Sequence, residues 1–280
     1  MKKVYVHLGY PKTGSKFIQK KIFPQLKNYQ VLNIPLNKRL KVFNIFLLDE
    51  ENFQIKKNKL IKFINKEFKN NKNFIITNEL FLHFENYSNI KISNIIKRFK
   101  QVFPKKNYNL NFFFFIRKPI DLIPSYYSEC YRDIVKMNKN WSSYEKFLLS
   151  LNKKGFFYKY FNFSKTYQQI CNINNQKCKI FIFEDIFFNT KFFIKDFINY
   201  FNLKNCKISV DTKEVVHLTE KISKNEYERK RVLIHKLFKK KNIIKSKKLL
   251  NIIYRIFTVD RVLVNKHNNN LISKVFKHTY

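Results

Sequence analysis

Two of the chain's three glycines, Gly9 and Gly14, lie within one segment of six residues. Glycines at such positions let successive backbone N–H groups wrap around an oxyanion, because no Cβ blocks the approach. Lys12 adds a full positive charge between them, and Thr13 and Ser15 add hydroxyl donors. The segment lies between the first predicted strand and the first predicted helix, whose N-terminus adds partial positive charge. This pattern predicts a loop that binds a phosphate-like anion.

A second candidate anion site follows an apolar run, Asn111–Ile116. Arg117 comes directly after this predicted strand, so we expect its side chain at the strand's carboxyl end. Pro119 favours the start of a helix, where its missing N–H is harmless, and Ser125 lies about two turns along that helix. A guanidinium that donates two parallel hydrogen bonds, together with a hydroxyl, suits a terminal phosphate.

The loop of nucleotide triphosphatases, GxxxxGK[ST], is one alternative for the first segment. Gly9 and Gly14 fit its spacing. The next two residues are Ser15 and Lys16, so the lysine comes one place late and no hydroxyl follows it to bind magnesium. The match to a kinase or nucleotide triphosphatase is therefore degenerate.

Three segments resemble motifs of sulfotransferases. Pro11–Lys16 reads PKTGSK and is similar to the family's 5′-phosphosulfate loop, PKTGTT or PKSGTT, from which it departs at Lys16. Arg117–Tyr127 resembles the 3′-phosphate motif in the form RxPxDxxxSxY, and Phe183–Ile186 resembles the (Y/F)ED(L/I) segment. The resemblance covers about residues 2–203, in the order that the family requires.

The resemblance implies 3′-phosphoadenosine 5′-phosphosulfate (PAPS) as the sulfuryl donor, without a metal. The residues implied to hold its 5′-phosphosulfate are Pro11, Lys12, Thr13, Gly14, Ser15 and Lys16. Arg117 and Ser125 are implied to hold its 3′-phosphate. Lys12 has a catalytic role as well, because it would neutralise the charge that grows on the bridging oxygen of the leaving phosphate.

A base must also accept the proton of the acceptor group. The predicted strand Phe74–Asn78 delivers Glu79 to the edge of the sheet where both phosphate motifs are expected. Sulfotransferases keep a catalytic His or Glu in this kind of place. We therefore predict Glu79 as the general base, with His83 as the second candidate, and we expect His7 to be structural.

Apolar runs that alternate with helical periodicity predict the elements that position these residues. The predicted strands are Val4–Leu8, one within Asn28–Pro35, Phe74–Asn78, Asn111–Ile116 and Lys179–Phe183. Helices are predicted after the first loop, over Leu40–Phe68, over Ile90–Phe103, through most of Ile120–Ile173 and over Lys191–Phe201. Apolar strands separated by helices indicate an α/β fold in three layers, with a central parallel sheet flanked by helices. The expected topology is like that of P-loop nucleotide triphosphatases, with extra C-terminal helices.

The C-terminal part is predicted to be a separate basic extension. We expect an α/β core over residues 1–210 and a helical extension over 211–280, packed on the core. Between Glu226 and Phe257, Lys and Arg interleave with apolar residues in a helical pattern. Such helices suit either a solvated basic face or peripheral contact with an anionic membrane. We expect a cytoplasmic protein, for which such contact would be at the inner face of the membrane.

The composition excludes some classes of protein and leaves others open. The 57 Lys and Arg against 19 Asp and Glu give a net charge of +38, but the chain has no alanine and few glycines, which indicates that codon bias towards AT-rich codons supplies much of the lysine. Apolar runs are too short for a membrane span, and the N-terminus lacks a signal-peptide pattern. Four cysteines without CxxC spacing indicate neither a zinc site nor a disulfide framework.

These patterns favour a sulfotransferase that modifies a hydroxyl or amine, with a carbohydrate or surface glycan as the acceptor class. One alternative is a P-loop kinase or nucleotide triphosphatase. The other is a basic nucleic-acid-binding protein, which the charge and the 18% aromatic content favour. Lysine rather than arginine carries most of the charge and no nucleic-acid-binding motif is present, so we expect no specific nucleic acid partner.

Overall fold

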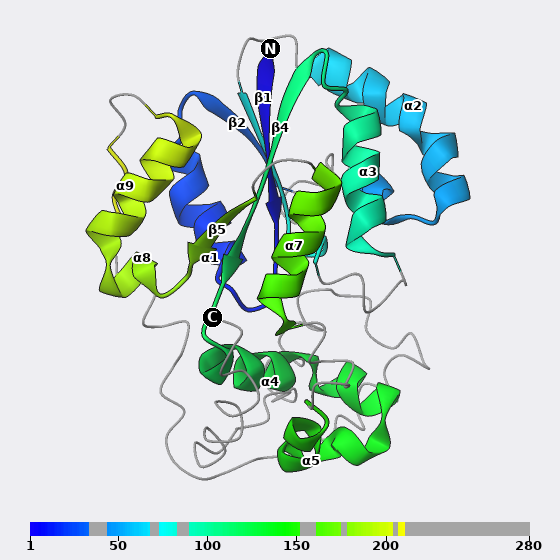
Figure 1. Ribbon diagram of the computed structural model, residues 1–280, viewed down its shortest axis with the longest axis vertical. Helices are drawn as coiled ribbons and strands as arrows, with labels where there is room; N and C mark the ends of the chain where they lie inside the picture. The colour runs from blue at the N-terminus through cyan, green and yellow to red at the C-terminus, as the bar shows by residue number, and fades with distance from the viewer. Residues whose placement is uncertain are drawn as a thin grey trace, which may run out of the picture. The chain divides into compact units, whose positions relative to one another are not determined.

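The central feature of the computed structural model is a parallel sheet. The model describes residues 1–33, 44–67, 73–82, 90–151, 161–174, 178–203 and 207–210. In these residues the sheet has five strands in the order β2-β3-β1-β4-β5, and every neighbouring pair is parallel (Figure 1). The strands are β1 (Lys2–Leu8), β2 (Tyr29–Asn33), β3 (Asn73–Asn78), β4 (Tyr108–Ile116) and β5 (Lys179–Ile182). The predicted parallel sheet is confirmed.

Helices cover both faces of this sheet. In the described part of the chain the α-helices are α1 (Ser15–Phe17), α2 (Glu50–Glu67), α3 (Ile92–Val102), α4 (Pro119–Met137), α5 (Tyr144–Leu149), α7 (Phe163–Asn174), α8 (Asp185–Phe188) and α9 (Thr190–Phe201). A π-helical turn, η1 (Ile18–Ile22), and a 3-10 turn, η2 (Phe23–Gln25), continue α1, and η5 (Lys139–Ser142) follows α4. One face carries α1, α8 and α9, and the other carries α2, α3 and α7 (Figure 1). The three-layer α/β fold is therefore confirmed.

The described residues fall into two compact units. Residues 1–118 and 162–210 form the first, which contains the sheet and the helices on its two faces. Residues 119–151 and 161 belong to the second, which contains α4, η5 and α5. Residues 211–280, predicted to be the basic helical extension, lie outside the described residues.

Aromatic side chains build the core on the face covered by α1, α8 and α9. Successive strand residues point to opposite faces of a sheet, so alternate residues of the central strands project here. Phe201 of α9 packs against Tyr5 and Phe113, with ring centroids 4.6 and 5.4 Å apart. Phe181 of β5 packs against Phe197 at 5.5 Å. These residues are buried, and their packing joins the sheet to α9.

The opposite face has its own aromatic contacts. Phe99 of α3 packs edge-on against Phe112 of β4 at 5.8 Å, and Phe46 stacks on Phe99 at 3.9 Å. All three side chains are buried. A continuous apolar strand such as β4 therefore has a helix layer on each side, which explains why its sequence does not alternate between polar and apolar residues.

The helix predicted over Leu40–Phe68 begins later than its apolar pattern suggests. Residues 44–47 form a short 3-10 turn, and α2 begins at Glu50. The Asp49 carboxylate accepts the backbone N–H of Asn52 at 2.8 Å and so caps the helix. The hydrogen bonds from the backbone N–H and the side-chain amide of Asn52 hold the pKa of Asp49 below its usual value.

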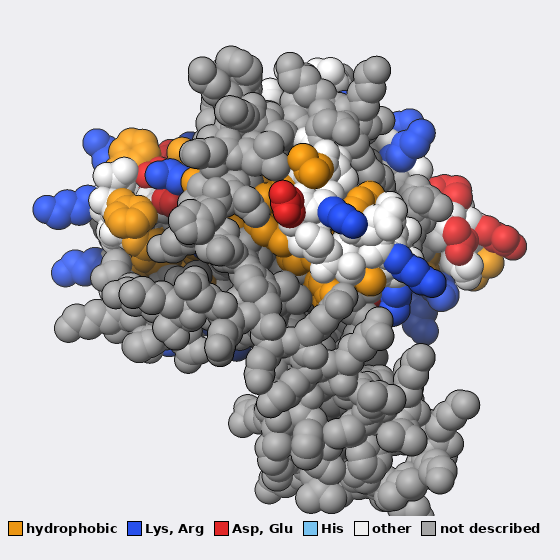
Figure 2. Space-filling view, turned by 90° about the horizontal axis from the view of Figure 1, so that it is seen from below, with side chains coloured by type: hydrophobic (Ala, Val, Ile, Leu, Met, Phe, Trp, Pro, Cys, Tyr) orange, Lys and Arg blue, Asp and Glu red, His pale blue; other side chains and the backbone are white. Residues whose placement is uncertain are grey.

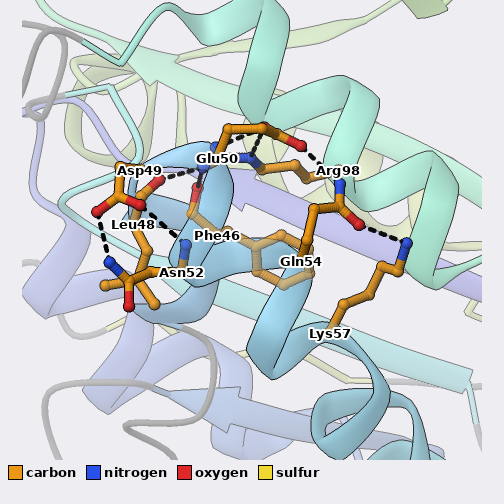
Figure 3. Close-up of polar contacts among 8 residues, drawn as sticks. All are labelled: Phe46, Leu48, Asp49, Glu50, Asn52, Gln54, Lys57 and Arg98. Atoms are coloured by element: carbon orange, nitrogen blue, oxygen red, sulfur yellow. Dashed lines mark hydrogen bonds and ion pairs between the residues drawn. The ribbon is translucent and has the colours of Figure 1, made fainter.

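A buried arginine fixes this turn against α3. The Arg98 side chain is 3% exposed and donates to the carbonyl oxygens of Phe46 and Leu48 and to the carboxylate of Glu50, the last at 2.8 Å (Figure 3). Its guanidinium also lies 4.7 Å from the ring centroid of Phe53. A buried charge is tolerated here because several acceptors surround it.

Basic side chains are interspersed with other kinds of side chain on the described part of one face. In the view of Figure 2, Lys and Arg side chains lie at separate places and are interspersed with acidic, uncharged and hydrophobic side chains. Among the described helices, none combines the length and apolarity that a membrane span needs.

Replacing Arg98 tests how strongly this arginine holds the turn. We expect Arg98→Met to lower the free energy of unfolding by roughly 2–4 kcal/mol, because two buried carbonyl oxygens lose their donor. Urea denaturation measures the change. Glu50→Gln is the matched control: the carboxylate is 62% exposed and in water, so its loss is expected to cost less than about 1 kcal/mol. Equal losses in the two variants would contradict this account.

Candidate active site

The predicted anion loop begins at the end of β1, directly beside the end of β3. The Gly9 N–H donates to the Asn78 carbonyl at 3.0 Å. A Cβ at Gly9 would lie 2.5 Å from the Cα of Glu79, closer than real Cβ contacts come. Glycine at position 9 therefore allows the start of the loop to lie against Glu79. The predicted anion loop and the predicted base Glu79 are therefore neighbours.

Two residues of the loop have left-handed backbone conformations. Lys12 has a φ of 63° and Gly14 a φ of 76°. This conformation suits Gly14, whereas it costs an L-residue such as Lys12 roughly 1–2 kcal/mol. Strain of this kind persists only where surrounding contacts hold it in place. The loop must therefore be fixed by its neighbours.

The hydroxyls of Thr13 and Ser15 contribute to that fixing. Both side chains are buried and both donate to the Tyr10 carbonyl, at 2.9 Å from Thr13 and 3.4 Å from Ser15. In this structure the two hydroxyls therefore form hydrogen bonds within the loop and stabilise its turn. The donors that the loop could offer to an anion are therefore its backbone N–H groups and its lysine side chains.

The two lysines of the loop differ in exposure. Lys12 is half-buried and Lys16 is exposed, while Pro11 before them is buried. Lys16 stands where the sulfotransferase motif has a second hydroxyl, so its ammonium group offers a point charge to an anion outside the loop.

Arg117 joins the second motif to the first. Its Nη1 donates to the Lys12 carbonyl at 3.2 Å, across 105 residues of sequence. Its guanidinium carbon lies 5.5 Å from the ring centroid of Phe183. The structure therefore brings Arg117, the loop and Glu79 to the same edge of the sheet, at the carboxyl ends of β4, β1 and β3.

The third motif connects the ends of β4 and β5. Glu184 is buried, and its Oε1 accepts the Lys118 N–H at 2.9 Å. The Phe183 N–H donates to the Ile116 carbonyl at 2.9 Å. This segment therefore positions the residues around Arg117.

Ser125 and His83 are not among the described residues of the first unit. Ser125 lies in α4, which starts at Pro119 as predicted, but it belongs to the second unit. Tyr127 of the same motif has a structural contact within that unit, since its hydroxyl donates to the Trp141 carbonyl at 2.9 Å. His83 lies outside the described residues.

A buried polar network beneath the loop was not predicted from sequence. The Nδ1 of His7 lies 2.7 Å from the Thr77 hydroxyl, which also accepts a hydrogen bond from Gln19 Nε2 at 3.0 Å. His7 is fully buried and stacks on Phe113 at 5.1 Å. Burial lowers the pKa of His7 to about 3, so its ring is neutral at ordinary pH. The sequence signal for this network is Gln19, a polar residue among the apolar residues that follow the first loop.

Comparisons with known proteins give little beyond this geometry. No family model matches the sequence, and no curated protein matches it. Among solved structures, a sulfotransferase from Alicyclobacillus acidocaldarius is similar, with 11% identity over 77% of this chain and 89% of that chain, and a TM-score of 0.46.

The neutral His7 predicts a pH dependence of stability. Its folded pKa lies below the unfolded value of about 6.5, so the unfolded chain binds one more proton between pH 6.5 and about 3. The free energy of unfolding should therefore fall as pH drops below 6.5, by up to about 1.4 kcal/mol per pH unit. Urea denaturation between pH 7 and pH 5 measures this slope. We expect His7→Gln to reduce it by the contribution of one proton, and an unchanged slope would show that His7 protonates within the fold.

Proposed function

We propose that the chain is a sulfotransferase that moves a sulfuryl group from PAPS to a hydroxyl or amine, with a carbohydrate as the acceptor class. The observation that carries the proposal is the contact between Arg117 Nη1 and the Lys12 carbonyl at 3.2 Å. Two sequence motifs that each suit an anion converge through it. A nucleotide with anionic groups at two separate positions accounts for such a pair better than a single phosphate does.

The residues of the loop suit the 5′-phosphosulfate. Lys12 and Lys16 supply positive charge, and the left-handed backbone at Lys12 and Gly14 turns successive N–H groups in the way that anion-binding loops do. Arg117 would hold the 3′-phosphate by charge-assisted hydrogen bonds, and the motif resemblance adds Ser125 to this role. The donor would lie across the carboxyl ends of the strands, where parallel α/β sheets bind their ligands.

Sulfuryl transfer in such a site depends on positioning and on charge. The acceptor oxygen or nitrogen forms a bond to sulfur while the bond from sulfur to the bridging oxygen breaks, and the electron pair stays on that oxygen. Lys12 would stabilise the negative charge that develops there. The Glu79 carboxylate would take the acceptor's proton, and the products are the sulfated acceptor and adenosine 3′,5′-bisphosphate. Glu79 follows β3 directly and its Cα abuts Gly9, which supports this role.

Binding of the desulfated product tests the proposal. We expect adenosine 3′,5′-bisphosphate to bind in calorimetry with EDTA present, because no metal takes part in holding it. Lys12→Ala should weaken this binding about tenfold or more, as expected for the loss of a charged contact to a phosphate. Lys20→Ala is the matched control, since it removes the same charge from an exposed position further along the same helical segment.

The outcomes of this experiment separate the three classes of function. Binding of a nucleoside triphosphate that requires magnesium would favour a kinase or nucleotide triphosphatase. Binding of single-stranded nucleic acid in place of the mononucleotide would favour a nucleic-acid-binding protein. Either result, without binding of the bisphosphate, would rule out the proposed donor.

Replacing Glu79 tests the assignment of the base. With labelled PAPS and an acceptor found by screening sugars, amino sugars and phenols, we expect Glu79→Gln to lower kcat by about 100-fold or more. Affinity for adenosine 3′,5′-bisphosphate should stay unchanged, because the amide keeps the shape of the carboxylate. Glu51→Gln, an exposed carboxylate of α2, is the control. Transfer by Glu79→Gln at nearly the wild-type rate would show that another group, such as His83, is the base.

A further inference from the structure

We infer that Arg117 and Phe183 form one support that holds the loop in its anion-binding shape, so that Arg117 sets affinity for the donor's 5′ side as well as for its 3′-phosphate. The inference rests on the proposed function for the identity of the ligand. Both residues are positioning residues for the loop. The motif resemblance gives Arg117 only a contact with the 3′-phosphate and gives Phe183 no contact with the donor.

Phe183 packs directly on the loop at Gly14. A Cβ added at Gly14 would lie 1.8 Å from Cε2 of the Phe183 ring and 2.5 Å from Cδ2. The ring thus fills the space that any side chain at position 14 would take. Phe183 is 9% exposed, and Phe187 packs on its ring at 5.2 Å. The ring has little room to move, so it fixes the position of the Gly14 backbone.

Arg117 supports the same loop at Lys12. Its Nη1 donates to the carbonyl oxygen of Lys12. Lys12 has a φ of 63°, a conformation that needs contacts from outside the loop. Its guanidinium lies 5.5 Å from the Phe183 ring centroid, within the range of a cation–π contact. Arg117 therefore contacts the loop directly at Lys12 and indirectly through the ring that covers Gly14.

The support is tied to the sheet and so has a rigid base. The Phe183 N–H continues the pairing of β5 with β4 through the Ile116 carbonyl, at 2.9 Å. Glu184 Oε1 accepts the Lys118 N–H, also at 2.9 Å. Arg117 and Phe183 are thus each flanked by a hydrogen bond between the ends of β4 and β5. The position of Arg117 relative to Phe183 therefore depends more on the sheet than on a ligand.

A guanidinium has five N–H groups arranged in a fork, and its Nη1 donates to the Lys12 carbonyl here. In the proposed function the same side chain also binds the 3′-phosphate.

Adenosine 5′-monophosphate, which lacks the 3′-phosphate, tests the inference. We expect Arg117→Gln to weaken its binding about tenfold, although this ligand offers Arg117 no phosphate at the 3′ position. The affinity of Arg117→Gln for adenosine 3′,5′-bisphosphate should fall about 100-fold, because the variant lacks both the phosphate contact and the loop support. Phe183→Leu should weaken both ligands by the same factor of about ten, since Phe183 acts only through the loop.

Two control variants distinguish loop support from general damage to the core. Phe103→Leu makes the same substitution in a buried aromatic residue that packs on Phe99 and Tyr108, and we expect both affinities to stay within about threefold of wild type. Phe183→Tyr keeps the ring over Gly14 and should restore binding. Unchanged binding of the monophosphate in Arg117→Gln, or equal effects of Phe183→Leu and Phe103→Leu, would overturn the inference.

Hydrogen–deuterium exchange without any ligand gives a second readout. We expect the peptide that covers residues 9–18 to exchange about tenfold faster in Arg117→Gln and Phe183→Leu than in wild type, and at the wild-type rate in Phe103→Leu. Unchanged exchange in the first two variants would overturn the inference. If wild type binds neither nucleotide, the proposed function fails, while exchange still decides whether Arg117 and Phe183 hold the loop.

Discussion

The position of β1 between β3 and β4 is the constraint on which the whole candidate site depends. Hydrogen-bond pairing places Leu8 beside Asn78 and His7 beside both Thr77 and Phe113. Because the three strands are parallel, the chain leaves each of them at the same edge. The loop after β1 therefore lies between Glu79, which follows β3, and Arg117, which follows β4. Any shift in this register would separate the groups that the proposed reaction needs together.

The scarcity of glycine acquires a physical meaning at this edge. Gly9 and Gly14 are positions where a Cβ would collide with another part of the chain, with the Glu79 backbone in one case and with the Phe183 ring in the other. A composition biased against glycine has kept it where backbone must approach backbone or an aromatic ring closely. The net charge of +38 carries less information, since the described Lys and Arg side chains are spread over the surface seen in Figure 2.

Much of the fold could be predicted from the sequence because its signals are local. Five apolar runs predicted the five strands, and Pro119 predicted the start of α4. Contacts between distant residues were beyond such reasoning. The pairing of His7 with Thr77 depends on strand register, and the Arg98 network depends on how α3 meets the turn before α2. The helix predicted from Leu40 begins at Glu50 because the Asp49 cap, rather than apolar spacing, sets its start.

The directions in which the side chains of the site point could not be predicted from the sequence either. Sequence identified Thr13 and Ser15 as hydroxyl donors, and the structure directs both hydroxyls to the Tyr10 carbonyl. Their contribution is therefore to the shape of the loop. Lys16, where the motif has a further hydroxyl, is exposed and lies outside this internal bonding. A lysine at position 16 changes what the loop presents to a ligand and leaves the bonds that shape it intact, which explains how the loop keeps its form despite departing from the motif.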